Sequence, residues 1–216
     1  EGTLESRERL ARLEAYRAEL GRLQRNQAPQ TPLFHALGEV VFAYGLPLRP
    51  FFDLLDAFSQ DVLKTRYADF PELIDYCRRS ADPVGRLMLH LFGEAREDNM
   101  PLSDSICSAL QLVNFLQDVA VDFRKGRIYL PQDELSRFGV SEAQIDAADA
   151  GGGWSDMMRF QAGRAGAIDP ELVVAAYRRA WTGSDLGDHG VFGEGLALGG
   201  RVLEEIDQRL ALGGVG

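Results

Sequence analysis

The sequence lacks the features that mark membrane-spanning, secreted and nucleic-acid-binding proteins. It has no run of about 18 apolar residues, so no membrane span is predicted. Its first ten residues are polar and do not contain the apolar core of a signal peptide. Acidic residues outnumber basic ones by 33 to 23, which argues against a nucleic-acid surface because such surfaces need clustered Lys and Arg. An anionic ligand stays compatible with this charge, since a divalent metal can bridge carboxylates to phosphates.

Cysteine and histidine are scarce. The two cysteines, Cys77 and Cys107, do not have the CxxC spacing of a metal or redox motif, so we expect reduced thiols in a cytosolic protein. The three histidines, His35, His90 and His189, stand at no metal-ligand spacing, and we interpret them as structural or surface residues. The sequence therefore gives no indication of a zinc or disulfide framework.

The alternation of apolar and polar residues that marks a strand is also missing, and almost every segment has a helical period. We therefore expect a single all-α domain over residues 1–216. The expected helices span residues 3–25, 32–44, 50–66, 70–93, 103–126, 132–138, 141–149, 154–167, 170–181 and 196–210. Pro83 is expected to kink the fourth of these, and a glycine-rich loop over 182–195 separates the last two.

A line of polar residues crosses the apolar segment 110–123. Gln111, Asn114, Asp118 and Asp122 follow the spacing i, i+3, i+7 and i+11, which places them on one face of a helix. Buried carboxylates without compensation are costly, so we expect a metal ion, a cationic partner or a wet cleft beside this face. Asp118 and Asp122 could each give one oxygen to Mg²⁺ and leave its other positions to water and phosphate.

The basic run Arg124, Lys125 and Arg127 follows directly. It has two interpretations that the residues leave equally open: cations for the same phosphates, or favourable charge near a helix C-terminus.

Two further segments contain residues that could carry chemistry. In segment 76–85 a tyrosine precedes the small residues Ala81 and Gly85, which would let a ligand tail or a neighbouring chain approach closely. From the residues alone, a kinked core helix with a buried tyrosine is the preferred interpretation. In segment 56–67, Asp61 and Lys64 have the spacing of an ordinary surface ion pair.

Together, these segments resemble the squalene and phytoene synthase family, whose enzymes join or rearrange prenyl diphosphates. Segment 76–85 is similar to the family signature Y-C-x-x-x-A-x-x-V-G, and segment 111–122 resembles its second aspartate-rich signature, Q-x-x-N-x-x-R-D-x-x-x-D. The resemblance extends over residues 3–166 and more weakly near the C-terminus. Gln117 replaces the family's usual arginine. This change resembles the hydroxysqualene synthase branch of bacterial hopanoid biosynthesis, as do the RRSADPVG variant and the RFQAGRA stretch.

The resemblance implies an isoprenoid synthase-type helical bundle that removes diphosphate from presqualene diphosphate and lets water capture the resulting cation. It implies roles for the following residues: Asp118 and Asp122 as Mg²⁺ ligands; Gln111 and Asn114 as catalytic supports of the metal–diphosphate assembly; Tyr76 beside the reacting centre; Arg66 and Arg127 as phosphate contacts or braces; and Ala81, Val84 and Gly85 as lining of the prenyl tunnel. A phenol at the Tyr76 position could stabilise a carbocation or pass a proton. Because squalene-type products are nearly insoluble in water, the resemblance also implies a cytoplasmic protein with a peripheral contact at the inner membrane.

The family's first aspartate-rich motif is missing. Glu1 and Gly2 resemble the residues that follow that motif, and the chain does not begin with Met. We therefore expect a partial chain, an N-terminally incomplete bundle, poor binding of Mg²⁺-diphosphate by this polypeptide alone and little or no turnover.

Two alternatives are open. One is a head-to-head prenyl transferase that makes squalene, phytoene or presqualene diphosphate. The other is a non-catalytic relative that acts as a binding or assembly module. The chain retains Tyr76 and the polar stripe of Gln111, Asn114, Asp118 and Asp122, which argues against a non-catalytic relative. Loss of the first aspartate-rich motif, by contrast, would be expected of such a relative.

Overall fold

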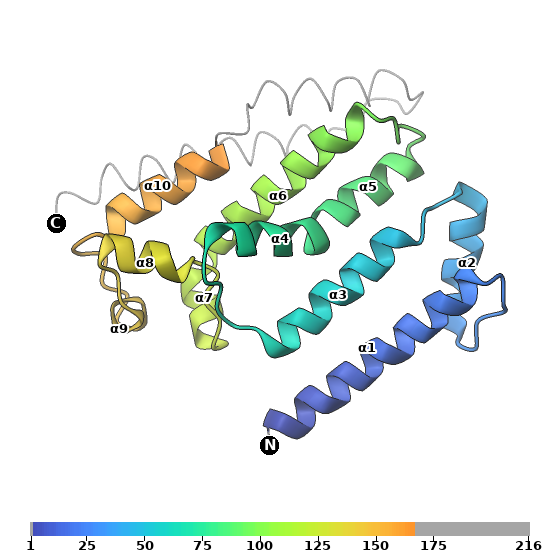
Figure 1. Ribbon diagram of the computed structural model, residues 1–216, viewed down its shortest axis with the longest axis horizontal. Helices are drawn as coiled ribbons and strands as arrows, with labels where there is room; N and C mark the ends of the chain where they lie inside the picture. Colours follow the sequence, from blue (N-terminus) through green and yellow to red (C-terminus); the bar gives the residue numbers. More distant parts are fainter. Residues whose placement is uncertain (1, 167–216) are drawn as a thin grey trace.

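Residues 2–166 are the part of the chain that the computed structural model describes, and they form α-helices with no strand among them (Figure 1). The helices are α1 Gly2–Gln24, α2 Pro32–Tyr44, α3 Arg49–Leu63, α4 Phe70–Ser80, α5 Asp82–Leu91, α6 Asn99–Gln117, α7 Val119–Arg124, α8 Gln132–Phe138, α9 Glu142–Asp146 and α10 Trp154–Gly166. The all-α prediction is confirmed within these residues. The predicted helices over 170–181 and 196–210 lie outside them, as does the 182–195 loop. Within 2–166, no helix has both the length and the apolarity that crossing a bilayer requires.

The long helices lie side by side and alternate in direction (Figure 1). Contacts join α1 to α3, α3 to α4 and α5, both of these to α6, and α6 to α10. The short helices α7, α8 and α9 gather at one end of this array, where α7 contacts α9 and α8 contacts α10. The end of α3, the start of α4 and the C-terminal end of α6 thus approach the same region.

Three apolar clusters hold the array together. The first lies between α1, α2 and α3 around Leu20, Phe34 and Leu55. The last packs α8 and α10 onto the segment after α7, around Ile128, Leu135 and Met157. The central cluster is the one that surrounds the candidate site, and its buried members are Ala57, Tyr67, Leu73, Tyr76, Cys77, Leu112, Phe115 and Ala165.

Helix α2 shows how local signals set helix ends. Pro32 occupies its first turn, where a missing N–H costs nothing. Gly45 follows its last residue with φ +60°, in the left-handed region that glycine enters without strain, and its N–H donates to the carbonyl of Val41. The predicted range 32–44 is therefore confirmed.

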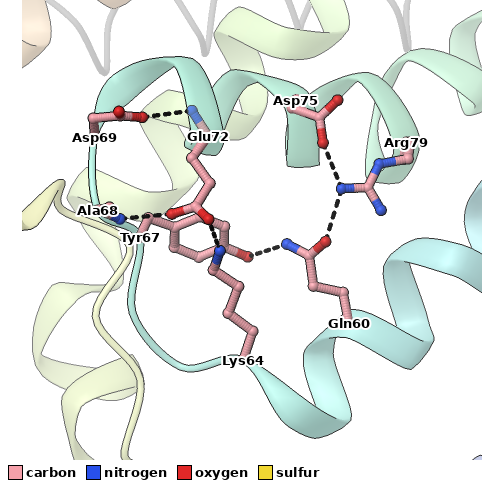
Figure 2. Close-up of polar contacts among 8 residues, drawn as sticks. All are labelled: Gln60, Lys64, Tyr67, Ala68, Asp69, Glu72, Asp75 and Arg79. Carbon is pink, nitrogen blue, oxygen red and sulfur yellow. Dashed lines mark hydrogen bonds and ion pairs between the residues drawn. The ribbon is translucent and has the colours of Figure 1, made fainter.

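The predicted end of α3 is wrong, because the helix stops about one turn earlier, at Leu63. Lys64 is extended, with φ −114° and ψ 130°, and its ammonium pairs with Glu72 on α4 (Figure 2). The expected pair between Asp61 and Lys64 does not form. Asp69 caps α4, since its Oδ1 accepts the Glu72 N–H at 2.9 Å.

The fourth predicted helix, over 70–93, is two helices. Helix α4 ends at Ser80 and α5 begins at Asp82, with Ala81 between them at φ −115° and ψ −52°. Pro83 therefore lies in the first turn of α5, where its ring is tolerated, and the expected kink is a full break.

We predict that Gly85→Ala destabilises the fold. A Cβ at this position would lie 2.3 Å from Ser103 Oγ and 2.5 Å from Cys107 Sγ, so α5 and α6 would have to separate or repack. The expected loss in free energy of unfolding is about 1–3 kcal/mol, measured by urea denaturation. Gly163→Ala in α10 is the control, because no atom of the described residues lies within 4 Å of its added Cβ, and it should be neutral or stabilising. Equal effects of the two variants would contradict the close approach.

We also predict a pH effect from Asp82, which is buried and accepts the Ser108 hydroxyl at 2.7 Å. Burial raises the pKa of Asp82 to about 6. The folded state therefore holds this proton more tightly than the unfolded state, and the associated stability is lost as pH rises through the folded pKa. Asp82→Asn should remove this loss, so its stability relative to the wild type should rise by up to roughly 3 kcal/mol between about pH 3 and pH 7, with about 1 kcal/mol of that rise between pH 5 and pH 7. An advantage that does not change with pH in urea denaturation would contradict this assignment.

Candidate active site

The candidate site is built around the buried phenol of Tyr76 on α4. Only 4% of this residue is exposed. Its ring centroid lies 5.5 Å from that of Tyr67, 5.9 Å from that of Tyr129 and 6.2 Å from that of Phe115. The rings of Phe115 and Tyr129 stack on each other at 4.0 Å. Four aromatic rings from α4, α6 and two connecting segments therefore form an electron-rich wall in the central core.

The Tyr76 hydroxyl donates a hydrogen bond to Asp61 Oδ2 at 2.9 Å. Asp61 stands in the last turn of α3 and is half-buried. Burial raises its pKa, against the hydrogen bond from Tyr76 and the charge of Arg127, which act in the opposite direction. Burial, together with neighbouring Tyr129 and Asp61, also raises the pKa of Tyr76 far above its usual range, so this group stays a neutral phenol.

Sequence reasoning missed Asp61 as a site residue. The sequence favours Lys64 as its partner, on a helix that continues to residue 66, whereas the structure pairs it with Tyr76, fifteen residues further along the chain. The aspartate itself and its nearness to a helix end were visible in the sequence, but nothing local indicated a contact with Tyr76.

The polar stripe does not lie on one continuous helix, because the chain breaks at Asp118. Gln111 and Asn114 lie on α6, Asp118 has φ −98° and ψ 10° at the junction, and Asp122 lies on α7. The expectation of a buried stripe is wrong: Asn114 and Asp118 are exposed, and Gln111 and Asp122 are half-buried. Asn114 and Asp118 therefore carry little of the burial cost that led us to expect compensation, and Asp122 carries most of what remains.

Asp118 and Asp122 remain close enough to influence each other. Burial is the main cause of the raised pKa of Asp122, the charge of Asp118 adds to it, and Lys125 and Arg127 oppose it. The Lys125 ammonium lies 3.8 Å from Asp122 Oδ1. The charge of Asp122 also raises the pKa of Asp61. The pocket around Tyr76 therefore shares one electrostatic environment with the carboxylates at the junction of α6 and α7.

The chemistry of this donor set fits Mg²⁺. Mg²⁺ is usually held by one or two protein carboxylates and takes its other oxygens from water and substrate phosphates. Asp118 and Asp122 would supply those carboxylates. Among residues 2–166, no group of three or more His, Cys, Asp or Glu side chains is arranged to hold a metal by itself.

The two predicted phosphate-contacting arginines have different environments. Arg127 donates to the backbone carbonyl of Asp61 at 2.9 Å, and its charge partly offsets the burial that raises the pKa of Asp61 and of Asp122. It therefore lies between the aromatic pocket around Tyr76 and the acidic arm, the name we give to Asp118 and Asp122 at the junction of α6 and α7. Arg66 donates two hydrogen bonds to the Glu142 carboxylate, at 2.7 and 2.9 Å, and one to the carbonyl of Gly126 at 2.7 Å. In this arrangement Arg66 braces the segment after α7.

The three predicted tunnel residues lie at the junction of α4 and α5. Ala81 is buried, Val84 is 50% exposed, and Gly85 packs against α6. A cavity of about 10 Å³, the size of a single water molecule, lies in the central apolar cluster. It is lined by Leu73, Leu112, Phe115, Leu116, Tyr129, Leu130 and Gln161, and none of the three predicted tunnel residues touches it.

Comparison with known proteins gives consistent matches. The model of the squalene/phytoene synthase family matches residues 1–205. A hydroxysqualene synthase from Sinorhizobium fredii is 48% identical over 105 residues, which are 48% of this chain and 36% of that protein. A phytoene synthase from Mycobacterium tuberculosis is 34% identical over 168 residues, which are 76% of this chain and 55% of that protein. The chain thus spans between about a third and just over half of these relatives.

The fold also matches solved structures. The crystal structure of squalene synthase HpnC from Alicyclobacillus acidocaldarius superposes with a TM-score of 0.78 at 35% identity, over 93% of this chain and 74% of that one. A dehydrosqualene synthase crystallised with a ligand superposes with a TM-score of 0.71 at 26% identity, over 78% of this chain and 59% of that one. The isoprenoid synthase-type helical fold is thereby confirmed.

We predict that Arg66 and Glu142 stabilise the fold as one unit. Arg66→Met and Glu142→Gln should each lower the free energy of unfolding by about 0.5–1 kcal/mol, because either change removes the same bidentate pair. The double variant should lose little more than Arg66→Met alone in urea denaturation, because Arg66→Met already removes the pair as well as the hydrogen bond to the Gly126 carbonyl. Additive losses would show that the two side chains act independently.

Proposed function

The chain belongs to the squalene/phytoene synthase family, and we propose that it carries the tyrosine pocket and the second acidic motif of a hydroxysqualene synthase-type active site. The proposed substrate is presqualene diphosphate. The observation that carries the proposal is the position of the Tyr76 phenol. It is buried among aromatic rings, and its partner Asp61 shares an electrostatic environment with Asp122.

This arrangement suits a reaction that separates charge. The bond between carbon and diphosphate oxygen breaks with both electrons leaving on the diphosphate, so a carbocation and an anion form together. Asp118 and Asp122 would hold Mg²⁺, whose charge would neutralise the departing diphosphate. Arg127 adds a fixed positive charge between the two regions.

The aromatic wall would receive the positive end. The faces of Tyr67, Phe115 and Tyr129 carry negative quadrupole density, which attracts a cation. Their burial also keeps bulk water from the cation. Water then forms a bond to the cationic carbon and loses a proton, which gives the alcohol hydroxysqualene. Because such a product is nearly insoluble in water, we also propose a peripheral contact with a membrane surface.

A head-to-head prenyl transferase is the second candidate. The match to the Mycobacterium tuberculosis phytoene synthase covers more of this chain than the match to the Sinorhizobium fredii protein. Gln117 and the SADPVG variant favour the hydroxysqualene branch instead. The third interpretation, a non-catalytic module, is disfavoured because Tyr76, Asp118 and Asp122 are all retained.

Product analysis tests the proposal. The chain is incubated with Mg²⁺ and either presqualene diphosphate or farnesyl diphosphate, both as it stands and joined to the part of the Alicyclobacillus acidocaldarius protein that its match leaves uncovered. We expect the joined protein to convert presqualene diphosphate to hydroxysqualene, and the chain alone to convert little or none. Conversion of farnesyl diphosphate alone would favour the transferase, and no conversion of either substrate by the joined protein would contradict both.

Asp122→Asn should lower the turnover of the joined protein by roughly a hundredfold, because it removes one of the two carboxylates proposed for Mg²⁺. Asp146→Asn is the matched control, since Asp146 is exposed on α9. If both variants keep wild-type turnover, the acidic arm does not take part in the reaction.

A further inference from the structure

The Asp61 carboxylate is a polar group that the proposed reaction has not yet used. Its Oδ2 accepts the Tyr76 hydroxyl at 2.9 Å. Its Oδ1 is buried and accepts no hydrogen bond from any of the described residues. A half-buried carboxylate whose single hydrogen bond comes from Tyr76 is costly to keep, which points to a purpose in that contact.

Hydrogen bonds from Arg127 and through Gln60 hold the end of α3 that carries Asp61. Carbonyls in the last turn of a helix have no partner within the helix, and the Asp61 carbonyl accepts instead from Arg127 Nη2 at 2.9 Å. The neighbouring Gln60 donates to the Tyr67 hydroxyl at 3.3 Å and accepts from Arg79 at 2.7 Å (Figure 2). The end of α3 is therefore fixed against α4 and the segment after α7.

We propose that Asp61 is a positioning residue that holds the hydroxyl proton of Tyr76, so that the phenol turns its oxygen lone pairs and its ring toward positive charge in the reacting centre. This inference rests on the proposed function. It also chooses between the two roles open to Tyr76, because it assigns stabilisation of the carbocation rather than donation of a proton.

The chemistry of a phenol supports this choice. Tyrosine has one O–H, so a phenol that donates to Asp61 has no proton left for the departing diphosphate. A hydrogen bond to a carboxylate is charge-assisted and raises the electron density on the phenol oxygen and ring. The phenol also keeps its proton, since burial and the charge of Asp61 both oppose ionisation.

The first test needs no substrate. Tyrosine is labelled with carbon-13 at Cζ, and the Tyr76 resonance is assigned by its loss in Tyr76→Phe. We expect Asp61→Asn to move this resonance away from the phenolate position, because a neutral amide withdraws the proton less than a carboxylate does. Asp56→Asn, on the same helix and paired with Arg17, makes the same charge change and should leave the resonance unmoved. An unmoved resonance in Asp61→Asn would overturn the inference whatever the activity of the protein.

The second test is a double-mutant cycle on turnover of the joined protein. Asp61→Asn should lower kcat roughly tenfold or more with little change in KM when Tyr76 is present, and should have no further effect in Tyr76→Phe. Additive losses would overturn the positioning role. A raised Mg²⁺ requirement in Asp61→Asn would make Asp61 a metal ligand and would also overturn it. If the joined protein without any substitution converts no substrate, the proposed function fails. The Tyr76 resonance alone then tests whether Asp61 positions the Tyr76 hydroxyl.

Discussion

The hydrogen bond between Tyr76 and Asp61 is the contact on which the rest of the site depends. It joins the end of α3 to the middle of α4 inside the central apolar cluster. Arg127 binds the same turn of α3 through the Asp61 carbonyl, so the segment that leaves the acidic arm is tied to the same point. The aromatic wall, the arginine and the acidic arm therefore keep their relative positions because one helix end is held from two directions.

The candidate site contains two kinds of environment, and the proposed ionisation of a prenyl diphosphate needs both. One side is apolar and aromatic, with Tyr76 buried among other rings. The other side is acidic and open to solvent, because the chain breaks at Asp118 and leaves that carboxylate exposed. Arg127 influences the carboxylates on both sides. A departing anion and a remaining cation can then be stabilised in adjacent but different surroundings.

Local chemistry allowed much of the fold to be predicted, and long-range contacts decided the rest. Pro32 and Gly45 fix the ends of α2, and Asp69 caps α4, all through interactions within a few residues. By contrast, α3 ends early where Lys64 turns away to pair with Glu72, and the break at Asp118 has no glycine or proline to announce it. The same holds for the candidate site. Its motifs can be recognised in the sequence, but the hydrogen bond between Asp61 and Tyr76 depends on how α3 and α4 pack and cannot be predicted locally.

The most direct test of this account is the origin of the oxygen in the product. When presqualene diphosphate is converted by the joined protein in heavy-oxygen water, mass spectrometry should find the heavy isotope in the hydroxyl group of hydroxysqualene, because water captures a cation after the carbon–oxygen bond to diphosphate has broken. Hydroxysqualene with only ordinary oxygen would mean that its hydroxyl oxygen came from the diphosphate and not from water. That result, or a hydrocarbon as the sole product, would contradict the account.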